Sequence, residues 1–344
     1  MSERLSADRR HPAAAVIDRA LQLVDPAMRR AIAALDDSHI RLISSYQMGW
    51  QDANGAPTES GGKALRPTLA VVSAAAVGQA EQGVPGGIAV ELVHNFSLIH
   101  DDVMDRDTER RHRPTAWTVF GDGQAILAGN AMLTVAFDVL IADGAAGARA
   151  LPCLTHSIHE LISGQSRDLA LEGADAIDLQ TCLSMEAGKT AALIAASASI
   201  GARAAGAAEA VYNGLYSYGF ELGMAFQLID DILGIVGDSA VTGKSSSSDV
   251  RAGKRSAPVV AALTADSLAA RRLAALLQDG PPTTEPDVER ATALIVEAGG
   301  LDWAAKEADS RLDAALRHLE PLDIDDSAKA DFAALARYVV DRDH

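Results

Sequence analysis

Two aspartate-rich clusters, each inside a helix-like apolar pattern, constrain the fold of this chain more than any other feature. The first is residues 98–105 (LIHDDVMD) and the second is residues 226–234 (FQLIDDILG); their leading aspartates, Asp101 and Asp230, are 129 residues apart. Carboxylates packed this closely repel one another unless a cation lies between them. Mg²⁺ takes oxygen ligands and is usually shared between one or two carboxylates and substrate phosphates. The clusters therefore predict two facing walls of one site that binds a diphosphate through magnesium.

The remaining pattern is helical. Ala and Leu dominate, only 4% of residues are aromatic, and no stretch alternates with a period of two, which favours helix over sheet. Helices are expected at residues 12–35, 66–77, 88–104, 125–142, 151–171, 179–205, 207–233 and 258–277, with three more before the C-terminus. Loops are expected at residues 52–62, 79–87, 106–114 and 280–286. Because the two clusters must meet, we predict one all-α bundle domain over residues 1–344, with a central cavity between its helices.

Charge and composition exclude several classes of protein. The net charge is −17 and the pI about 4.9, which argues against nucleic acid or an anionic membrane surface as the main partner. We expect no apolar run long enough to span a bilayer, which takes roughly 18 to 20 residues; residues 190–202 are the best candidate and too short. Residues 1–10 lack the apolar core of a signal peptide. The two cysteines, Cys153 and Cys182, suggest a reducing compartment. We expect a soluble cytoplasmic protein without membrane insertion.

The first cluster lies at the C-terminal end of its predicted helix. Asp101 and Asp105 fall one turn apart on one face with Asp102 beside them, and Ser97 and His94 lie one and two turns earlier. Such a row lines one wall of a cavity. The alternative is a solvated helix end, but the helix dipole disfavours negative charge at this end. The cavity wall is the better interpretation.

A different metal site is also compatible with the spacing. Glu91-x-x-His94 and Glu109-x-x-His112 both match the Glu-x-x-His spacing of di-iron helix bundles. The second pair lies in an arginine-rich loop before Pro114, which is a poor position for two inward-facing ligands. We keep the di-iron site as a minor alternative, since spacing alone is a weak signal.

Three basic segments accompany the acidic clusters. They are residues 61–67 (GGKALRP), residues 110–114 (RRHRP), and Lys244 with Lys254 and Arg255. Alone, each would be interpreted as a solvated charge run. An acidic protein that binds a polyanion must gather its few cations locally, however, and glycine, lysine and arginine beside a helix start suit an anionic group. Together with the aspartates, these segments indicate a diphosphate site.

Taken in chain order, the motifs resemble those of the trans-isoprenyl diphosphate synthases, also called polyprenyl synthetases, over about residues 61–262. The matching residues are Gly62-Lys63-x-x-Arg66-Pro67, His94, Asp101-Asp102-x-x-Asp105, Arg110-Arg111, Pro114-Thr115, Lys189-Thr190, Phe226-Gln227-x-x-Asp230-Asp231, Gly243-Lys244, Asp249 and Lys254. Bacterial geranylgeranyl diphosphate synthases are the most similar members. The resemblance implies a helical bundle of the isoprenoid synthase type and a Mg²⁺-dependent prenyltransferase of isoprenoid and terpenoid biosynthesis.

The resemblance also implies a role for each matched residue. Isopentenyl diphosphate would be held by Lys63, Arg66, His94 and Arg111. The allylic diphosphate would be held by Arg110, Lys189, Thr190, Gln227, Lys244 and Lys254, with Lys189, Thr190, Gln227 and Lys244 serving catalysis. Three Mg²⁺ ions are implied, with the ligands Asp101, Asp102, Asp105, Asp230 and Asp231. Cleavage of the allylic diphosphate would leave an allylic cation, which the isopentenyl double bond attacks.

The chain departs from the family pattern in the second cluster. Gly234 stands where relatives often have Asp, and Asp238, one turn further on, would replace it if the helix continues. Asn130 likewise stands where relatives often carry Asp, with no predicted consequence. The serine run at residues 245–248 is expected to form a flexible flap over the diphosphate.

In this family, bulky residues four or five positions before the first aspartate block chain growth. Phe96 is fifth and Ser97 is fourth, and the motif has no two-residue insertion. This pattern resembles geranylgeranyl diphosphate synthases better than farnesyl ones. We expect Phe96 to form the floor that stops elongation at C20.

Four alternatives remain open. Two of them differ in the product: a farnesyl diphosphate synthase and a longer-chain diphosphate synthase. A class I terpene cyclase also ionises an allylic diphosphate but needs no second diphosphate site, and a non-catalytic partner subunit of a related synthase tends to lose its aspartates. The chain has the residues of a second diphosphate site and keeps its aspartates, which favours condensation. A homodimer is implied by the resemblance alone.

Overall fold

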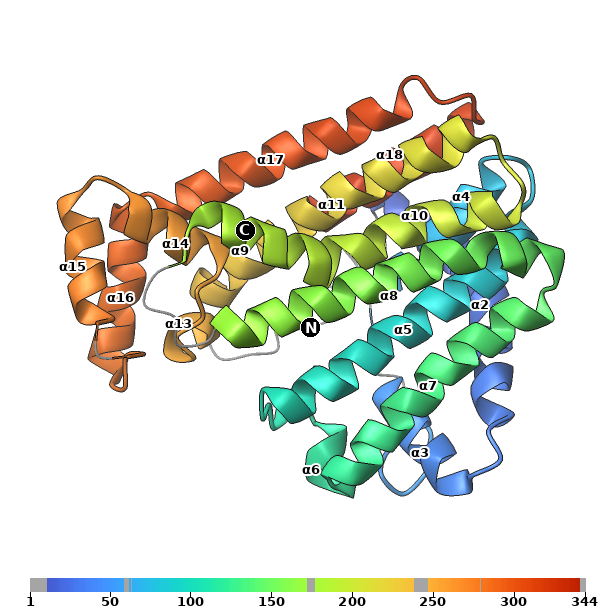
Figure 1. Ribbon diagram of the computed structural model, residues 1–344, viewed down its shortest axis with the longest axis horizontal. Helices are drawn as coiled ribbons and strands as arrows, with labels where there is room; N and C mark the ends of the chain where they lie inside the picture. The colour runs from blue at the N-terminus through green and yellow to red at the C-terminus, as the bar shows by residue number, and fades with distance from the viewer. Residues whose placement is uncertain are drawn as a thin grey trace.

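The computed structural model describes residues 11–58, 62, 64–171, 177–237, 247–278 and 280–340, and every structural statement below concerns these residues. The N-terminal half contains the helices α2 (Pro12–Ala33), α3 (Ser38–Gln47), α4 (Leu65–Ala75), η1 (Ala80–Gln82), α5 (Gly83–Met104), α6 (Ala116–Phe120), α7 (Asp122–Ala142) and α8 (Ala145–Leu171). The C-terminal half contains α9 (Leu179–Glu186), the π-helical turn η2 (Ala187–Ala191), α10 (Ala192–Ala204), α11 (Glu209–Val236), α13 (Ser248–Arg251), α14 (Ala257–Thr264), α15 (Leu268–Leu276), α16 (Glu285–Glu297), α17 (Gly300–Leu319) and α18 (Asp326–Val340). The all-α prediction is confirmed (Figure 1).

Helix α10 is the centre of the bundle and packs against α4, α5, α8 and α11. Leu193 and Ile200 on one face belong to the core shared with α2, α5, α7 and α8. Ile194 and Ala198 on another face belong to the core shared with α4, α11 and α18. This helix contains most of the segment 190–202, and its alanines and serines let neighbouring backbones approach closely. Its apolar sequence therefore reflects burial on all sides.

Helices α5 and α11 position the two aspartate clusters. Each carries its cluster in its last turns, and their carboxyl ends both lie toward the left of Figure 1, on the side of α13. A buried apolar face holds each helix in the bundle, since α5 packs on α4 and α7, and α11 packs on α10 and α17. The bundle thus brings clusters that are distant in the sequence to the same side of the molecule.

Three sequence predictions of local structure were wrong. The chain does not break at Pro85-Gly86-Gly87, because α5 already begins at Gly83. A Cβ at Gly83 would lie 2.5 Å from the Ala70 carbonyl oxygen, so glycine serves close packing against α4. The predicted helix 258–277 is two helices, separated where Ser267 accepts a hydrogen bond from Ala270 N and caps α15. The predicted loop 106–114 contains the antiparallel two-residue strands β1 (Glu109–Arg110) and β2 (Arg113–Pro114).

Helix α7 corrects the expectation that no segment could span a bilayer. It is 21 residues long with a mean hydropathy of 1.9, enough by length and composition, although many soluble proteins contain such a helix in their core. Only part of it is buried: Leu127 and Ile141 are 53% and 66% exposed, whereas Met132 and Ala136 are inaccessible. The helix thus has one face in the core and one apolar face at the surface.

Candidate active site

The first acidic wall is the end of α5. Burial raises the pKa of Asp101 to about 6, and the neighbouring carboxylate of Asp105 acts in the same direction, while the ammonium of Lys189 opposes both. Asp105 caps the helix, and its buried Oδ1 accepts no hydrogen bond from any group in the described ranges. A buried carboxylate oxygen without a donor fits a cation. Asp101 and Asp105 therefore form a wall suited to a metal.

Asp102 has a different environment. Its side chain is only 1% exposed, and Arg110 Nε donates a hydrogen bond of 2.6 Å to its Oδ1. Successive helical side chains point about 100° apart, so Asp102 is turned away from the face that Asp101 and Asp105 share. The structure thus places Asp102 behind the wall, where it holds the guanidinium of Arg110.

The arginine-rich hairpin is held rigidly next to this wall. Arg111 and His112 form its two-residue turn with φ of 53° and 59°, a left-handed conformation that favours glycine or asparagine. Arg113 donates hydrogen bonds to the carbonyl oxygens of Tyr46 (3.1 Å) and Gln51 (2.9 Å), and Tyr46 Oη donates to Pro114 O (2.7 Å). These contacts fix a strained turn that presents Arg110 and Arg111 side by side.

The predicted residues for isopentenyl diphosphate come together in part. His94 lies two turns before the acidic wall, and burial followed by the nearby Arg66, Arg111 and Arg110 holds its pKa well below the usual range. The guanidinium of Arg111 also lies against Gly62, about 3.0 Å from where a Cβ would be. A neutral histidine among three guanidinium groups suits an anionic ligand. Lys63 lies outside the described residues.

The opposite wall begins at the π-helical turn η2, where the sequence had predicted an uninterrupted helix. Lys189 in this turn forms an ion pair with Asp168 of α8, and Thr190 Oγ1 donates a hydrogen bond of 2.7 Å to Gln227 Oε1 of α11. Helix α8 approaches closely here, because a Cβ at Gly164 would lie 2.2 Å from Lys189 N. Single π turns are frequent at functional sites. This one directs Lys189 and Thr190 toward α8 and α11.

Sequence reasoning missed Asp168 and Gln165, one turn apart on α8. Gln165 is 7% exposed, and neither its amide nitrogen nor its amide oxygen has a hydrogen-bond partner within the described part of the chain. The available signal was the polar set Gly164, Gln165 and Asp168 on one side of an otherwise ordinary helix. The spacing fits one face of a helix, but the partner Lys189 could not be read from it.

The second cluster repeats the division seen in the first. Asp230 is exposed, whereas Asp231 is 5% exposed and accepts hydrogen bonds from Gln227 Nε2 (2.6 Å) and Ala257 N (3.3 Å). Burial, followed by the nearby carboxyl of Glu186, raises the pKa of Asp231 well above its usual range. The structure thus places Asp230 at the surface and Asp231 inside the protein.

Gly234 makes room for another carboxylate. A Cβ at this position would lie 2.1 Å from Asp249 Oδ2, so Asp249 of α13 occupies the space of the side chain that Gly234 lacks. Helix α13 is held against α11 by Ser247 Oγ, which donates to Ile235 O (2.9 Å). Helix α11 ends at Val236 and Gly237 is extended, so the condition set for Asp238, a helix that continues past Gly237, is not met. Asp238 itself, Lys244, Ser245 and Ser246 lie outside the described residues, so the roles predicted for Lys244 and the serines stay predictions.

Lys254, just after α13, lies among carboxylates from several elements. Desolvation by the surrounding protein lowers its pKa, but the carboxylates of Asp249, Asp105, Asp107 and Asp168 outweigh this and raise it above the usual value. These carboxylates belong to α13, to α5 and the loop after it, and to α8. The ends of α5, α8 and α13 therefore share one electrostatic environment.

The predicted chain-length residues lie on α5, one turn from the acidic wall. Phe96 is 8% exposed and packs edge-on against His100, with ring centroids 4.8 Å apart. The His100 ring reaches α7, where Nε2 lies 3.0 Å from Ile126 O. Ser97 is 9% exposed and donates to His94 O (2.9 Å).

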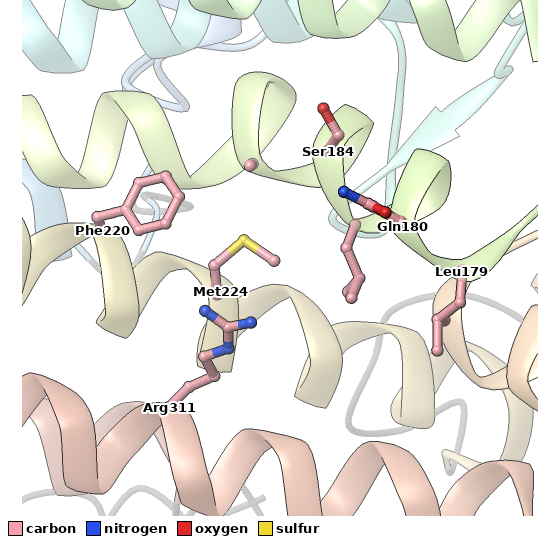
Figure 2. Close-up of a pocket in the computed structure, with 8 residues that line it drawn as sticks. Leu179, Gln180, Ser184, Phe220, Met224 and Arg311 are labelled. Atoms are coloured by element: carbon pink, nitrogen blue, oxygen red, sulfur yellow. The ribbon is translucent and has the colours of Figure 1, made fainter.

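A cavity of about 510 Å³ lies elsewhere, between α9, α11 and α17 (Figure 2). Phe220, Met224 and Arg311 line it together with residues of α9. None of the predicted site residues does. The described residues also contain no three His, Cys, Asp or Glu side chains that converge as a metal cage, which leaves the di-iron alternative without an assembled ligand set. The acidic walls instead suit a cation that a substrate phosphate completes.

Comparison with known proteins identifies the class. The family model of polyprenyl synthetases matches residues 51–295. The (2E,6E)-farnesyl diphosphate synthase of Mycobacterium tuberculosis is 44% identical over 333 residues, which cover 95% of this chain and 92% of that protein. The geranylgeranyl diphosphate synthase of the same organism is 43% identical over 309 residues, covering 89% and 88%. A crystal structure of a polyprenyl synthetase from Streptomyces coelicolor A3(2) superposes with a TM-score of 0.91 at 44% identity and covers 95% of this chain and 99% of that one.

The chain belongs to the polyprenyl synthetase family and is a trans-prenyl diphosphate synthase, a prenyltransferase of isoprenoid biosynthesis. The predicted family is confirmed. Synthases of two product lengths are similar to this chain to nearly the same degree, so similarity does not decide the product.

Proposed function

We propose that this chain, as one bundle domain, condenses isopentenyl diphosphate with allylic diphosphates head to tail and in the all-trans configuration, using Mg²⁺, and releases geranylgeranyl diphosphate. The observation that carries the proposal is the environment of Lys254. Its pKa is raised by carboxylates from α13, from the end of α5 and from α8. A diphosphate at this point would lie beside the carboxylates of α13, of the end of α5 and of α8.

The metal would be held by the carboxylates that face the site. Asp101, Asp105 with its unpartnered Oδ1, and Asp230 fit Mg²⁺, whereas Asp102 and Asp231 are committed to Arg110 and Gln227. Three ions are proposed from the family resemblance. Bound Mg²⁺ neutralises the negative charge that develops on a diphosphate leaving group.

The cationic side chains would hold the two substrates next to each other. Lys189, Thr190 and Gln227 lie together on the wall formed by η2 and α11 and would bind the allylic diphosphate, with Arg110, Lys244 and Lys254. His94, Arg66 and Arg111 would form the second site for a diphosphate, to which Lys63 would contribute. Two diphosphate sites favour condensation over cyclisation. Fixing both substrates supplies much of the rate enhancement, and apolar walls exclude water that would quench the allylic cation.

Phe96 would end the elongation cavity. Its ring is buried on α5 and braced by His100, which in turn contacts α7. We predict that Phe96→Ala lengthens the products beyond C20, as measured by chromatography of the dephosphorylated prenols. Ser97→Ala, which removes only a hydroxyl at the neighbouring position, is the matched control and keeps the product at C20. An unchanged product from Phe96→Ala would reject Phe96 as the floor.

The exposed face of α7 supports a homodimer. Ile126, Leu127 and Ile141 on α7 and Ile162 on α8 are between 41% and 66% exposed. Large apolar side chains exposed on neighbouring helices are a feature of protein–protein interfaces. Multi-angle light scattering should give a dimer mass, and Leu127→Glu should reduce it. A cytoplasmic location belongs to the same proposal, supported by the acidic charge and by two free, buried cysteines.

One assay tests the proposed reaction. The purified protein is incubated with Mg²⁺, isopentenyl diphosphate and each allylic primer in turn, and the product length is measured. We expect consumption of isopentenyl diphosphate, a C20 product, and loss of turnover when the metal is chelated. Turnover without isopentenyl diphosphate would indicate a terpene cyclase, and no turnover would indicate a non-catalytic subunit.

A further inference from the structure

A buried hydrogen-bond network behind the allylic diphosphate site contains a residue to which no role has been given. Glu186 is the last residue of α9, immediately before η2, and is 3% exposed. Its Oε1 accepts hydrogen bonds from Ala257 N (3.2 Å) and from Cys182 Sγ (3.4 Å). Its Oε2 is buried and, apart from the neighbouring carboxyl of Asp231, meets no polar partner among the described residues. Burying a carboxyl with so few hydrogen bonds lowers the stability of the fold, which suggests that this one has a functional role.

Glu186 and Asp231 share a single backbone donor. Ala257 N, in the first turn of α14, also donates to Asp231 Oδ2 (3.3 Å), and the two carboxyl side chains lie within hydrogen-bond reach of each other. The carboxyls therefore join three elements, α9, α11 and α14. Neither side chain can move without disturbing the other, because both depend on one N–H group.

The network continues into the site. Asp231 Oδ1 accepts from Gln227 Nε2 (2.6 Å), and Gln227 Oε1 accepts from Thr190 Oγ1 (2.7 Å). An amide has distinct donor and acceptor ends. With the amide nitrogen of Gln227 donating to Asp231, the amide oxygen faces Thr190. The orientation of two predicted substrate-binding side chains thus depends on where Asp231 is held.

We propose that Glu186 is a positioning residue for the allylic diphosphate site, which acts through Asp231 and Gln227 on Thr190. The proposal rests on the proposed function, since it assigns Thr190 and Gln227 to substrate. Glu186 itself touches no substrate. Residues that support the groups in contact with substrate or metal typically change affinity or activity 10- to 100-fold when they are removed.

The test compares Glu186→Met with Glu186→Gln. Methionine has a similar length but no hydrogen bonds, so it leaves little cavity, whereas glutamine can accept from Ala257 N and donate to Asp231. We expect Glu186→Met to lower kcat/KM for the allylic diphosphate about 10- to 100-fold, with KM for isopentenyl diphosphate changed less than about twofold. Glu186→Gln should stay within about threefold of the wild type. Cys182→Ala, which removes the other side-chain contact of Glu186, is the matched control and should shift only Tm.

A double-mutant cycle separates positioning from general stabilisation. Because Glu186 acts through Thr190, Glu186→Met should cost little further activity in a Thr190→Val background. Equal losses in both backgrounds, or a Glu186→Met protein with a lowered Tm and unchanged kinetics, would overturn the proposal. If Glu186→Met fails to fold, failure of Glu186→Gln to preserve the wild-type kinetics overturns it instead. Absence of turnover in the wild type would reject the proposed function and this inference with it, whereas wild-type turnover with indifference to Glu186 rejects the inference alone.

Discussion

The second aspartate of each acidic cluster is buried, but the two buried carboxyls have different partners. Asp102 on α5 pairs with the guanidinium of Arg110, whereas Asp231 on α11 meets the neutral amide of Gln227 and another carboxyl, Glu186. In each pair the other aspartate is more accessible to the site. Each Asp-Asp pair thus divides into one more accessible carboxyl and one buried carboxyl held by a polar side chain, Arg110 or Gln227. Asp102 therefore has a positively charged partner, whereas Asp231 has none.

The largest effect should come from the outer aspartates. Asp101→Asn or Asp230→Asn removes a ligand charge where the diphosphate develops negative charge, and losing one such group typically costs about 10²- to 10³-fold in kcat. Steady-state rates at saturating Mg²⁺ and substrate measure this. Asp107→Asn, which changes a carboxylate just beyond the cluster, is the control and should cost less than tenfold. Near wild-type rates for Asp230→Asn would show that the second cluster does not take part in catalysis.

The inner aspartates should differ in their effect on stability. Asp102→Asn leaves the Arg110 guanidinium without its buried partner and should lower the free energy of unfolding by about 2 kcal/mol, less than for a fully buried pair because Arg110 is 25% exposed. Asp231→Asn replaces a carboxyl whose pKa burial already raises well above its usual range, so no buried ion pair is lost and we expect unchanged or increased stability. Urea denaturation of the two variants measures both. Equal destabilisation would show that the two clusters are not different in this respect.

Gly234 and Asp249 should be interchangeable as a source of carboxylate. Gly234→Asp alone forces a side chain into the space of Asp249 Oδ2 and should lower activity about tenfold or more, within the range seen for supporting residues of metal sites. The double variant Gly234→Asp with Asp249→Ala has no such obstruction. It should recover much of the lost activity, because the carboxylate then comes from α11. Activity is followed as a function of Mg²⁺ concentration. A double variant no better than either single variant would contradict the exchange.

The smallest effect is a pH dependence of the stability of the metal-free protein. Asp101 has a pKa of about 6 in the folded state against an ordinary 3.8, chiefly because of burial, so between these values the folded protein holds more protons than the unfolded one. Stability must then fall as the pH rises from about 4 to about 6. Asp101→Asn abolishes this contribution and should flatten the profile of unfolding free energy measured in urea with a chelator present. Parallel profiles for the two proteins would contradict the raised pKa.

Much of the bundle could be predicted from the sequence, because long apolar periodic stretches such as those of α5 and α11 report helices directly. The start of α5 was wrong since glycines that serve packing resemble glycines that form turns. The π turn at Lys189 could not be seen, because the helix that follows it is apolar on all sides and has no polar face whose position would report the extra residue. Spacing likewise placed Asp102 and Asp231 in the site but could not tell that their side chains turn inward. That depends on Arg110 and Glu186, which pack against them from other parts of the chain.

The most direct test of the two-walled site is a crystal structure with Mg²⁺ and a thiolo analogue of an allylic diphosphate, which resists cleavage. We predict that the analogue's phosphate oxygens and the bound ions lie between Asp101 and Asp105 on α5 and Asp230 on α11, with Lys189 and Lys254 against the diphosphate. An analogue bound to one helix only, with Asp230 contacting neither ion nor diphosphate, would contradict the account.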